Sequence, residues 1–154
     1  MSRSLEIFVD GACSGNPGEA AIGVVILENQ TKIKEISKAI GHGTNNIAEY
    51  TAFIYALQEA LILKADNLKI FTDSELVFKQ LTGQYVVKNA NLKSLFDQVK
   101  HLTQGFKHIE IKNIPREQNK DADKLATQPL KQKQAKMVAP LLFHSGEESP
   151  GSEG

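Results

Sequence analysis

Hydrophobic and polar residues follow two different periods along this chain, and the two periods predict strands and helices in a definite order. Short apolar or alternating segments, typical of strands, occupy residues 5–9, 20–27, 32–40, 68–72 and 108–114. Apolar positions that recur every three or four residues, typical of amphipathic helices, occupy about 44–64, 74–82, 91–104 and 119–131. The predicted element order is therefore βββαβααβα.

The links between these segments predict how the strands pair. The first three strands are joined by short links, and the first link (11–18) holds three glycines and Pro17, so we expect an antiparallel meander. Helical segments connect the last two strands, which should therefore run parallel to each other. The result is an α/β fold with a five-stranded mixed β-sheet flanked by helices, although the pattern alone would suit several α/β folds.

Length and composition are those of one soluble globular domain, with 154 residues, 41% hydrophobic and 23% charged. We expect this domain to span 1–138. The remaining tail, 139–154, is apolar as far as His144 and then small, polar and acidic, so we expect its end to be disordered. No apolar segment reaches the roughly 18 residues that a membrane span needs.

The ends and the single cysteine bear on location. The N-terminus leads directly into the first predicted strand, which predicts no signal peptide. Cys13 is the single cysteine and has no partner for an internal disulfide, so we expect a cytoplasmic protein.

Charge is unevenly distributed, although the net charge is zero. Residues 1–86 carry 7 basic and 10 acidic side chains, whereas residues 87–143 carry 11 basic and 5 acidic ones. A basic region beside an acidic site could hold a phosphate backbone. Solvated lysines on helix faces explain the same distribution equally well.

Four acidic residues are the candidates for chemistry: Asp10, Glu49, Asp73 and Asp123. If the first and fourth strands are neighbours at the sheet centre, Asp10 and Asp73 lie near one edge, and the first and last helices can bring the other two acids over it. Four carboxylates in one place repel each other unless cations neutralise them. Carboxylate oxygens suit Mg²⁺, so convergence predicts a metal site.

Three of the acids also have structural explanations. Glu49 lies three residues after Asn46, as in a capping box. Asp73 precedes a helix that it could cap, and Asp123 lies in a first helical turn, where the helix dipole favours negative charge. Asp10 follows an apolar strand and caps no evident helix, so a functional role is favoured there on the residues alone.

The residues around the acids resemble ribonuclease HI, the type 1 RNase H family, over about residues 4–130. The matching motifs are Val9-Asp10-Gly11 with Gly15-Asn16-Pro17-Gly18, Thr44 to Glu49, Thr72-Asp73-Ser74, and Asn119 to Ala126. The resemblance implies an RNase H-like fold and an endonuclease that hydrolyses the RNA strand of RNA–DNA hybrids. It also implies two Mg²⁺ ions per site, with Mn²⁺ as a substitute, and products with 5′-phosphate and 3′-hydroxyl ends.

The same resemblance implies individual roles. Asp10 would bridge both ions, Asp73 and Asp123 would each favour one ion, and Glu49 would hold metal-bound water near the 2′-hydroxyl. The residues that would contact substrate are Gly11, Cys13, Ser14, Asn16, Thr44, Asn45 and Asn46. Helix capping by one of the paired asparagines, and a plain turn at Asn16, are the alternatives.

This sequence departs from the family pattern in three places. Many relatives have a loop histidine before the last helix, whereas this loop offers Arg116, which could hold a phosphate, assist turnover, or form a surface ion pair with Glu117 or Asp121. Glu75 stands where many relatives have glutamine. The segment 81–95 is too short for a basic protrusion, and no N-terminal hybrid-binding domain is expected, which leaves room for activity on double-stranded RNA.

Other classes of function remain open on the sequence. A non-catalytic hybrid-binding module, a DNA-directed nuclease and an RNase H domain separated from a reverse transcriptase would each share this fold. Four intact acids disfavour the first, because a binder gains nothing from carboxylates beside phosphate. We expect a monomer without membrane contact, and residues 139–143 could pack on the body or contact a protein partner.

Overall fold

The predicted order of elements is confirmed. The structure, a computed structural model, describes residues 2–144 and the side chains of residues 2–133. The strands are β1 (Ser4–Gly15), β2 (Gly18–Glu28), β3 (Thr31–Gly43), β4 (Asn67–Thr72) and β5 (His108–Asn113). The helices are α1 (Asn45–Ile62), α2 (Glu75–Leu81), α3 (Ala90–Thr103), the short 3₁₀ helix η1 (Arg116–Gln118) and α4 (Lys120–His144).

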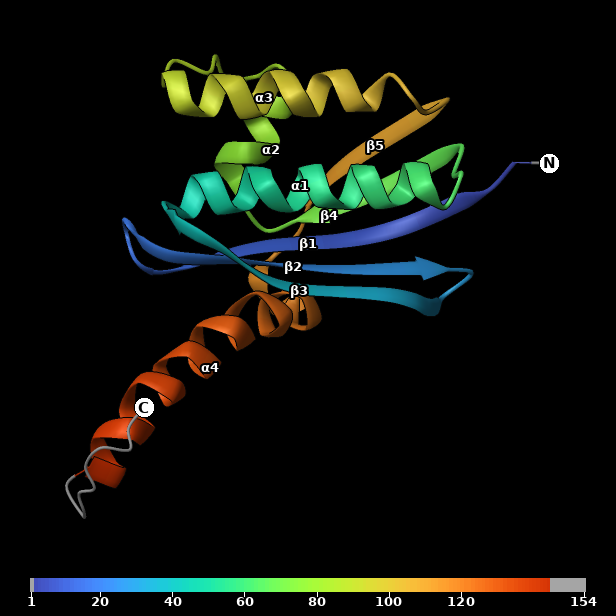
Figure 1. Cartoon of the computed structure of the whole chain (residues 1–154). Helices are drawn as coiled ribbons and strands as arrows, with labels where there is room; N and C mark the ends of the chain where they lie inside the picture. The colour runs from blue at the N-terminus through green and yellow to red at the C-terminus, as the bar shows by residue number, and fades with distance from the viewer. Residues whose placement is uncertain (1, 145–154) are drawn as a thin grey trace.

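The five strands form one mixed sheet in the order β3-β2-β1-β4-β5. β1, β2 and β3 pair antiparallel, while β1–β4 and β4–β5 pair parallel, as the links predict. Helix α1 lies along one face of the sheet with α3 beside it, and α4 crosses the opposite face over β2 and runs away from the body (Figure 1). The first and fourth strands are therefore the neighbours at the centre that the site requires.

The hydrophobic core lies between the sheet and α1. Strands β1, β2 and β4 contribute alternate apolar side chains, and α1 contributes the largest ones. The fully buried members include Leu5, Ile7, Val9, Ile22, Val24, Ile26, Ile70, Tyr50, Phe53 and Leu57. Because both layers bury their apolar face here, the ends of the central strands are held rigidly.

Two predicted boundaries were wrong. β1 does not end at Val9 but continues to Gly15, because 11–15 pair with the start of β2 across a tight hairpin. The last helix does not end near Lys131 but continues to His144, since 131–137 consist of Lys, Gln, Ala and Met, which favour helix without an apolar period. The side chains of the predicted apolar segment and residues 145–154, expected to be disordered, lie outside the described residues.

The link between α2 and α3 comprises only residues 82–89. This confirms that the part of the chain described here has no basic protrusion at that point. None of the helices within residues 2–144 combines the length and the apolar character that a membrane span requires.

Candidate active site

The strand register brings Asp10 and Asp73 together. The parallel ladder between β1 and β4 ends with the pair Val9 and Thr72. Asp10 and Asp73 directly follow this pair along the chain, so both carboxylates emerge where β4 stops. β1 continues beyond this point because Asp10 pairs with Gly23 of β2. Asp10 therefore lies within its strand, at the end of the parallel ladder, and not at the strand end that the sequence predicts.

Gly11 lets helix α1 approach the sheet beside Asp10. A Cβ atom on Gly11 would collide with the backbone of Ala48 and would lie 2.5 Å from the Glu49 nitrogen. This close approach places the Glu49 carboxylate over β1, where Glu49 Oε1 accepts a hydrogen bond from the Gly11 backbone N–H at 3.0 Å. Any larger residue would push α1 and Glu49 away from the strand.

Gly23 lets helix α4 approach the opposite face of the sheet in the same way. A Cβ atom there would collide with the Ala122 carbonyl oxygen and lie 2.6 Å from the Ala126 nitrogen. Gly23 is the cross-strand partner of Asp10, so α4 starts directly beside that acid. Ala122 and Ala126 are fully buried, and Asp123, in the first turn of α4, is held at the edge of the site.

The four predicted acids converge, with three of them in close contact. Ligand atoms of Asp10, Glu49 and Asp73 all lie within 4.8 Å of one another. These side chains are almost wholly buried, whereas Asp123 lies at the rim with 38% of its side chain exposed. This is a cluster of three buried carboxylates with a fourth beside it.

Burial and mutual repulsion oppose ionisation of the innermost acids. Burial, and then the charge of Asp73, raises the pKa of Asp10 from 3.8 to about 8. Burial, followed by the charges of Asp10 and Asp73, also raises the pKa of Glu49 well above its ordinary value, although the bond from Gly11 opposes the change. A divalent cation would favour the ionised forms and relieve both effects.

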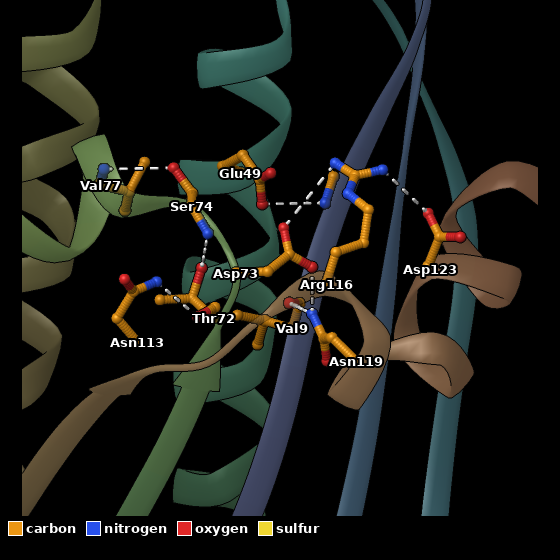
Figure 2. A network of polar contacts seen from close by, with 11 residues as sticks. Val9, Glu49, Thr72, Asp73, Ser74, Val77, Asn113, Arg116, Asn119 and Asp123 are labelled. Atoms are coloured by element: carbon orange, nitrogen blue, oxygen red, sulfur yellow. Dashed lines mark hydrogen bonds and ion pairs between the residues drawn. The ribbon is translucent and has the colours of Figure 1, made fainter.

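Arg116 and Asn119 surround Asp73 (Figure 2). The Arg116 guanidinium lies 3.9 Å from Asp73 Oδ1 and 3.9 Å from Asp123 Oδ1. The alternative of a surface ion pair with Glu117 or Asp121 is not what the structure shows, because Arg116 of η1 faces the carboxylates of Asp73 and Asp123 instead. Asn119 donates from Nδ2 to Asp73 Oδ2 at 2.8 Å, a contact that the sequence reasoning missed although Asn119 lay within a recognised motif.

The donor set suits a hard divalent cation. Three converging carboxylates supply only oxygen ligands, which Mg²⁺ and Mn²⁺ prefer. Asp10 Oδ1 is buried and has no hydrogen-bond partner among the described residues. An orphaned carboxylate oxygen in such a cluster is costly unless an ion binds to it.

The predicted substrate-contact residues form a second, polar region beside the acids. Asn16, Thr44 and Asn46 line a cavity of about 280 Å³ together with Asn89 and residues of the α3 start. Asn16 Oδ1 accepts a hydrogen bond from the Asn45 backbone N–H at 3.1 Å. The hairpin of β1 and β2 is thereby tied to the start of α1.

The other predicted contacts differ in accessibility. Ser14 is exposed on the β1–β2 hairpin, whereas Cys13 is partly buried and donates its Sγ–H to the Gly43 carbonyl at 3.2 Å. Gly11 lies beneath Glu49, where its backbone N–H is already engaged. Ser14 is therefore free to meet a ligand, while Cys13 and Gly11 shape the site.

The capping alternatives are wrong. Thr44, and not an asparagine of the pair, caps α1 by accepting from the Ile47 N–H. Ser74, and not Asp73, caps α2 by accepting from the Val77 N–H. Because neighbouring hydroxyls satisfy these helix starts, the carboxylates of Glu49 and Asp73 are left for the cluster.

Fold and carboxylate cluster together define the class of ribonuclease H-like α/β domains, and comparison with known proteins agrees. A family model described as reverse transcriptase-like matches residues 8–128. The crystal structure of RNase H1 from Halobacterium salinarum superposes with a TM-score of 0.82 at 37% identity, over 84% of this chain and 98% of that one. The chain belongs to this reverse transcriptase-like family and, within it, to the ribonuclease H proteins.

Two further matches are a structure solved with nucleic acid and a longer protein. LC11-RNase H1, solved in complex with an RNA/DNA hybrid, superposes with a TM-score of 0.77 at 36% identity, over 80% of this chain and 94% of that one. The bifunctional protein Rv2228c of Mycobacterium tuberculosis is 38% identical over 122 residues, 78% of this chain. The chain spans only 34% of that relative, and 62% of the ribonuclease HI of H. salinarum, to which it is 40% identical.

Proposed function

We propose that the protein is a metal-dependent endoribonuclease that hydrolyses the RNA strand of RNA–DNA hybrids. The observation that carries this proposal is the cluster of Asp10, Glu49 and Asp73, whose ligand atoms lie within 4.8 Å of one another. The structure of LC11-RNase H1, which is 36% identical to this chain and was solved with an RNA/DNA hybrid, supports the choice of substrate. A binding module would gain nothing from such a cluster, because buried carboxylates repel phosphate.

The four acids have distinct tasks in this proposal. Two Mg²⁺ ions, or Mn²⁺ in their place, would activate a water and stabilise the leaving 3′ oxygen when bound there. Asp10 would contribute to both ions, and Asp73 and Asp123 would contribute to one each. Glu49 is held over β1 by Gly11, where its carboxylate can position a water near the 2′-hydroxyl.

Arg116 has a separate task at the rim. Its side chain is 71% exposed and its guanidinium faces both Asp73 and Asp123. A planar guanidinium in this position can hold a phosphate oxygen of the strand as it enters the carboxylate cluster. We therefore assign Arg116 to substrate binding in place of the missing loop histidine.

The polar cavity is the proposed contact region for the nucleic acid backbone. Asn16, Thr44 and Asn46 line this cavity, the Asn45 backbone N–H is bonded to Asn16, and Ser14 is exposed on the β1–β2 hairpin. Such groups can hydrogen-bond to the 2′-hydroxyl that distinguishes RNA from DNA and to phosphate oxygens. Gly11 and Cys13 belong to strand β1, where Gly11 bonds to Glu49 and Cys13 bonds to the Gly43 carbonyl.

Several finer features are also proposals. The link between α2 and α3, whose single basic residue is Lys88, is too short for a basic protrusion that grips a hybrid, which is compatible with activity on double-stranded RNA. We also propose that the protein is a monomer. We propose a cytoplasmic location because Cys13 is a free thiol. A domain of 1–138, with a tail from 139 that contacts a partner protein, remains a proposal for truncation to test.

A substrate panel tests the proposed function. The purified protein is incubated with Mg²⁺ and with four labelled 20-mers of one sequence: RNA–DNA hybrid, double-stranded RNA, double-stranded DNA and single-stranded RNA. We expect cleavage of the hybrid RNA strand with 3′-hydroxyl ends, and slower cleavage of double-stranded RNA. Binding of hybrid without cleavage would instead establish a binding module, and preferential cleavage of DNA would establish a DNA-directed nuclease.

A further inference from the structure

One buried asparagine, Asn119, bonds to three of the acid-bearing elements, two of them through its side-chain amide (Figure 2). Asn119 is 1% exposed and immediately precedes α4. Its Nδ2 donates to the Val9 carbonyl oxygen at 2.9 Å and to Asp73 Oδ2 at 2.8 Å. Its backbone carbonyl accepts from the Asp123 backbone N–H at 3.0 Å. One residue thus bonds to the strand that carries Asp10, to Asp73 itself and to the helix turn that carries Asp123.

The chemistry of the amide permits only one orientation. The two hydrogens of Nδ2 match the two acceptors, the Val9 carbonyl and the Asp73 carboxylate. A reversed Asn119 amide would face both acceptors with its oxygen and would repel them. In the observed orientation Asn119 Oδ1 is buried without a hydrogen-bond partner among the described residues. The side chain is therefore held by the two bonds that it donates.

These bonds bear on the geometry of the proposed metal ligands. The bond to Asp73 Oδ2 fixes the rotation of that carboxylate and leaves Oδ1 facing Arg116. The bond to Val9 fixes the strand residue directly before Asp10. Without such donors, the repulsion between Asp73 and Asp10 would turn the carboxylates apart.

We propose that Asn119 is a positioning residue of the metal site, which sets the rotation of the Asp73 carboxylate and its spacing from Asp10. This inference rests on the proposed function, because it assumes that the cluster holds divalent cations. Groups that orient metal ligands typically change metal affinity by about 10- to 100-fold when they are removed. Asn119 itself contacts neither ion nor substrate in this role.

Binding of Mn²⁺ without nucleic acid tests the inference separately from catalysis. Free Mn²⁺ is followed by its electron paramagnetic resonance signal during titration of the wild type, Asn119→Ala and Asn119→Ser. Gln80→Ala is the matched control: Gln80 is another buried amide, bonded to the Tyr50 hydroxyl at 2.6 Å, and it makes no hydrogen bond to a carboxylate. Circular dichroism establishes that each variant is folded at the titration temperature.

We expect Asn119→Ala to bind Mn²⁺ about 10- to 100-fold more weakly than the wild type, and Gln80→Ala to bind it normally despite a lower melting temperature. Asn119→Ser, which keeps one donor, should lie between them and provides the measurement if the alanine variant does not fold. Binding within twofold of the wild type by folded Asn119 variants would overturn the positioning role, as would an equal loss in Gln80→Ala. A wild type that binds no Mn²⁺ would overturn the proposed metal site itself.

Discussion

The Gly11 backbone N–H donates to Glu49 Oε1 at 3.0 Å, joining strand β1 to helix α1 beside Asp10. The bond exists because Gly11 has no side chain, which lets the backbone of Ala48 and Glu49 come into contact with the strand. The motif glycine therefore determines where an acid from a different element lies. The close packing of the α1 backbone on Gly11 thus sets the place of the Glu49 carboxylate beside Asp10.

Replacing Gly11 by alanine should reduce both the cleavage rate and the stability of the fold. The new Cβ would meet backbone atoms that cannot rotate away, so α1 and Glu49 must shift, at a cost of about 1–3 kcal/mol in unfolding free energy. A displaced catalytic carboxylate lowers kcat by about 100-fold. Gly43→Ala is the control, because its Cβ would lie 3.4 Å from the Ile47 side chain, an ordinary contact. Equal kcat values for the two variants would contradict the explanation.

Asp10→Asn should stabilise the metal-free protein at neutral pH while it abolishes cleavage. Burial and the charge of Asp73 raise the pKa of Asp10 from 3.8 to about 8, so the folded state holds this proton more tightly than the unfolded state. The resulting stability is present below pH 4 and is lost as the pH rises toward 8. At pH 7 the variant should gain up to about 4 kcal/mol in unfolding free energy.

Thermal unfolding in EDTA between pH 4 and 8 checks this prediction. The melting temperature of the wild type should fall as the pH rises, with a smaller fall in Asp10→Asn, and Mg²⁺ should restore the wild type selectively. Glu49, whose pKa is raised in the same direction, accounts for the slope that remains in the variant. Parallel curves for the two proteins would show that Asp10 ionises without penalty.

Arg116→Ala should weaken hybrid cleavage without weakening metal binding. The guanidinium lies 3.9 Å from both Asp73 and Asp123, where its positive charge opposes cation binding and attracts phosphate. We expect kcat/KM to fall about tenfold, the effect of one charge-assisted hydrogen bond. The slope of the logarithm of hybrid affinity against the logarithm of salt concentration should become shallower by about one. Mn²⁺ affinity should stay equal or increase. Arg116→Lys keeps the charge and should keep the salt dependence of hybrid affinity. An unchanged kcat/KM in Arg116→Ala would contradict the role of Arg116 in substrate binding.

Glu75→Gln should improve substrate binding. Glu75 is exposed, two residues beyond Asp73, and its carboxylate pairs with the Lys79 ammonium at 2.9 Å, which lowers the pKa of Glu75. The substitution removes a negative charge near the phosphates and releases Lys79. KM for hybrid should fall by up to about fivefold at low salt, with kcat unchanged and the effect lost at high salt. Glu35→Gln, which removes the carboxylate of the exposed Lys32–Glu35 ion pair, is the comparison and should leave KM unchanged.

Sequence periodicity predicts the element order and the pairing of strands, since each strand and helix has its own apolar pattern. It cannot predict that β1 continues to Gly15, because residues 11–15 are small, have no alternating apolar pattern and are held by pairing with β2. The end of α4 is missed for a related reason: 132–137 favour helix by propensity but have no apolar face.

In the candidate site, too, the sequence predicts some features and misses others. The motifs single out all four acids, and the register of β1 with β4 explains why Asp10 and Asp73 meet. The partner of Arg116 could not be predicted, because it depends on the turn that η1 makes between β5 and α4. Asn119 was missed as an individual residue because an asparagine before a helix also suits a cap, and only its buried bonds distinguish the two roles.

Cleavage of a labelled RNA–DNA hybrid during a Mg²⁺ titration, by the wild type and by Asp10→Asn, tests the central claim most directly. The account predicts no cleavage in EDTA, cleavage by the wild type that rises and saturates with Mg²⁺, and none by the folded variant at any concentration. Cleavage by the wild type in EDTA, or equal cleavage by both proteins, would contradict a metal site built on these carboxylates.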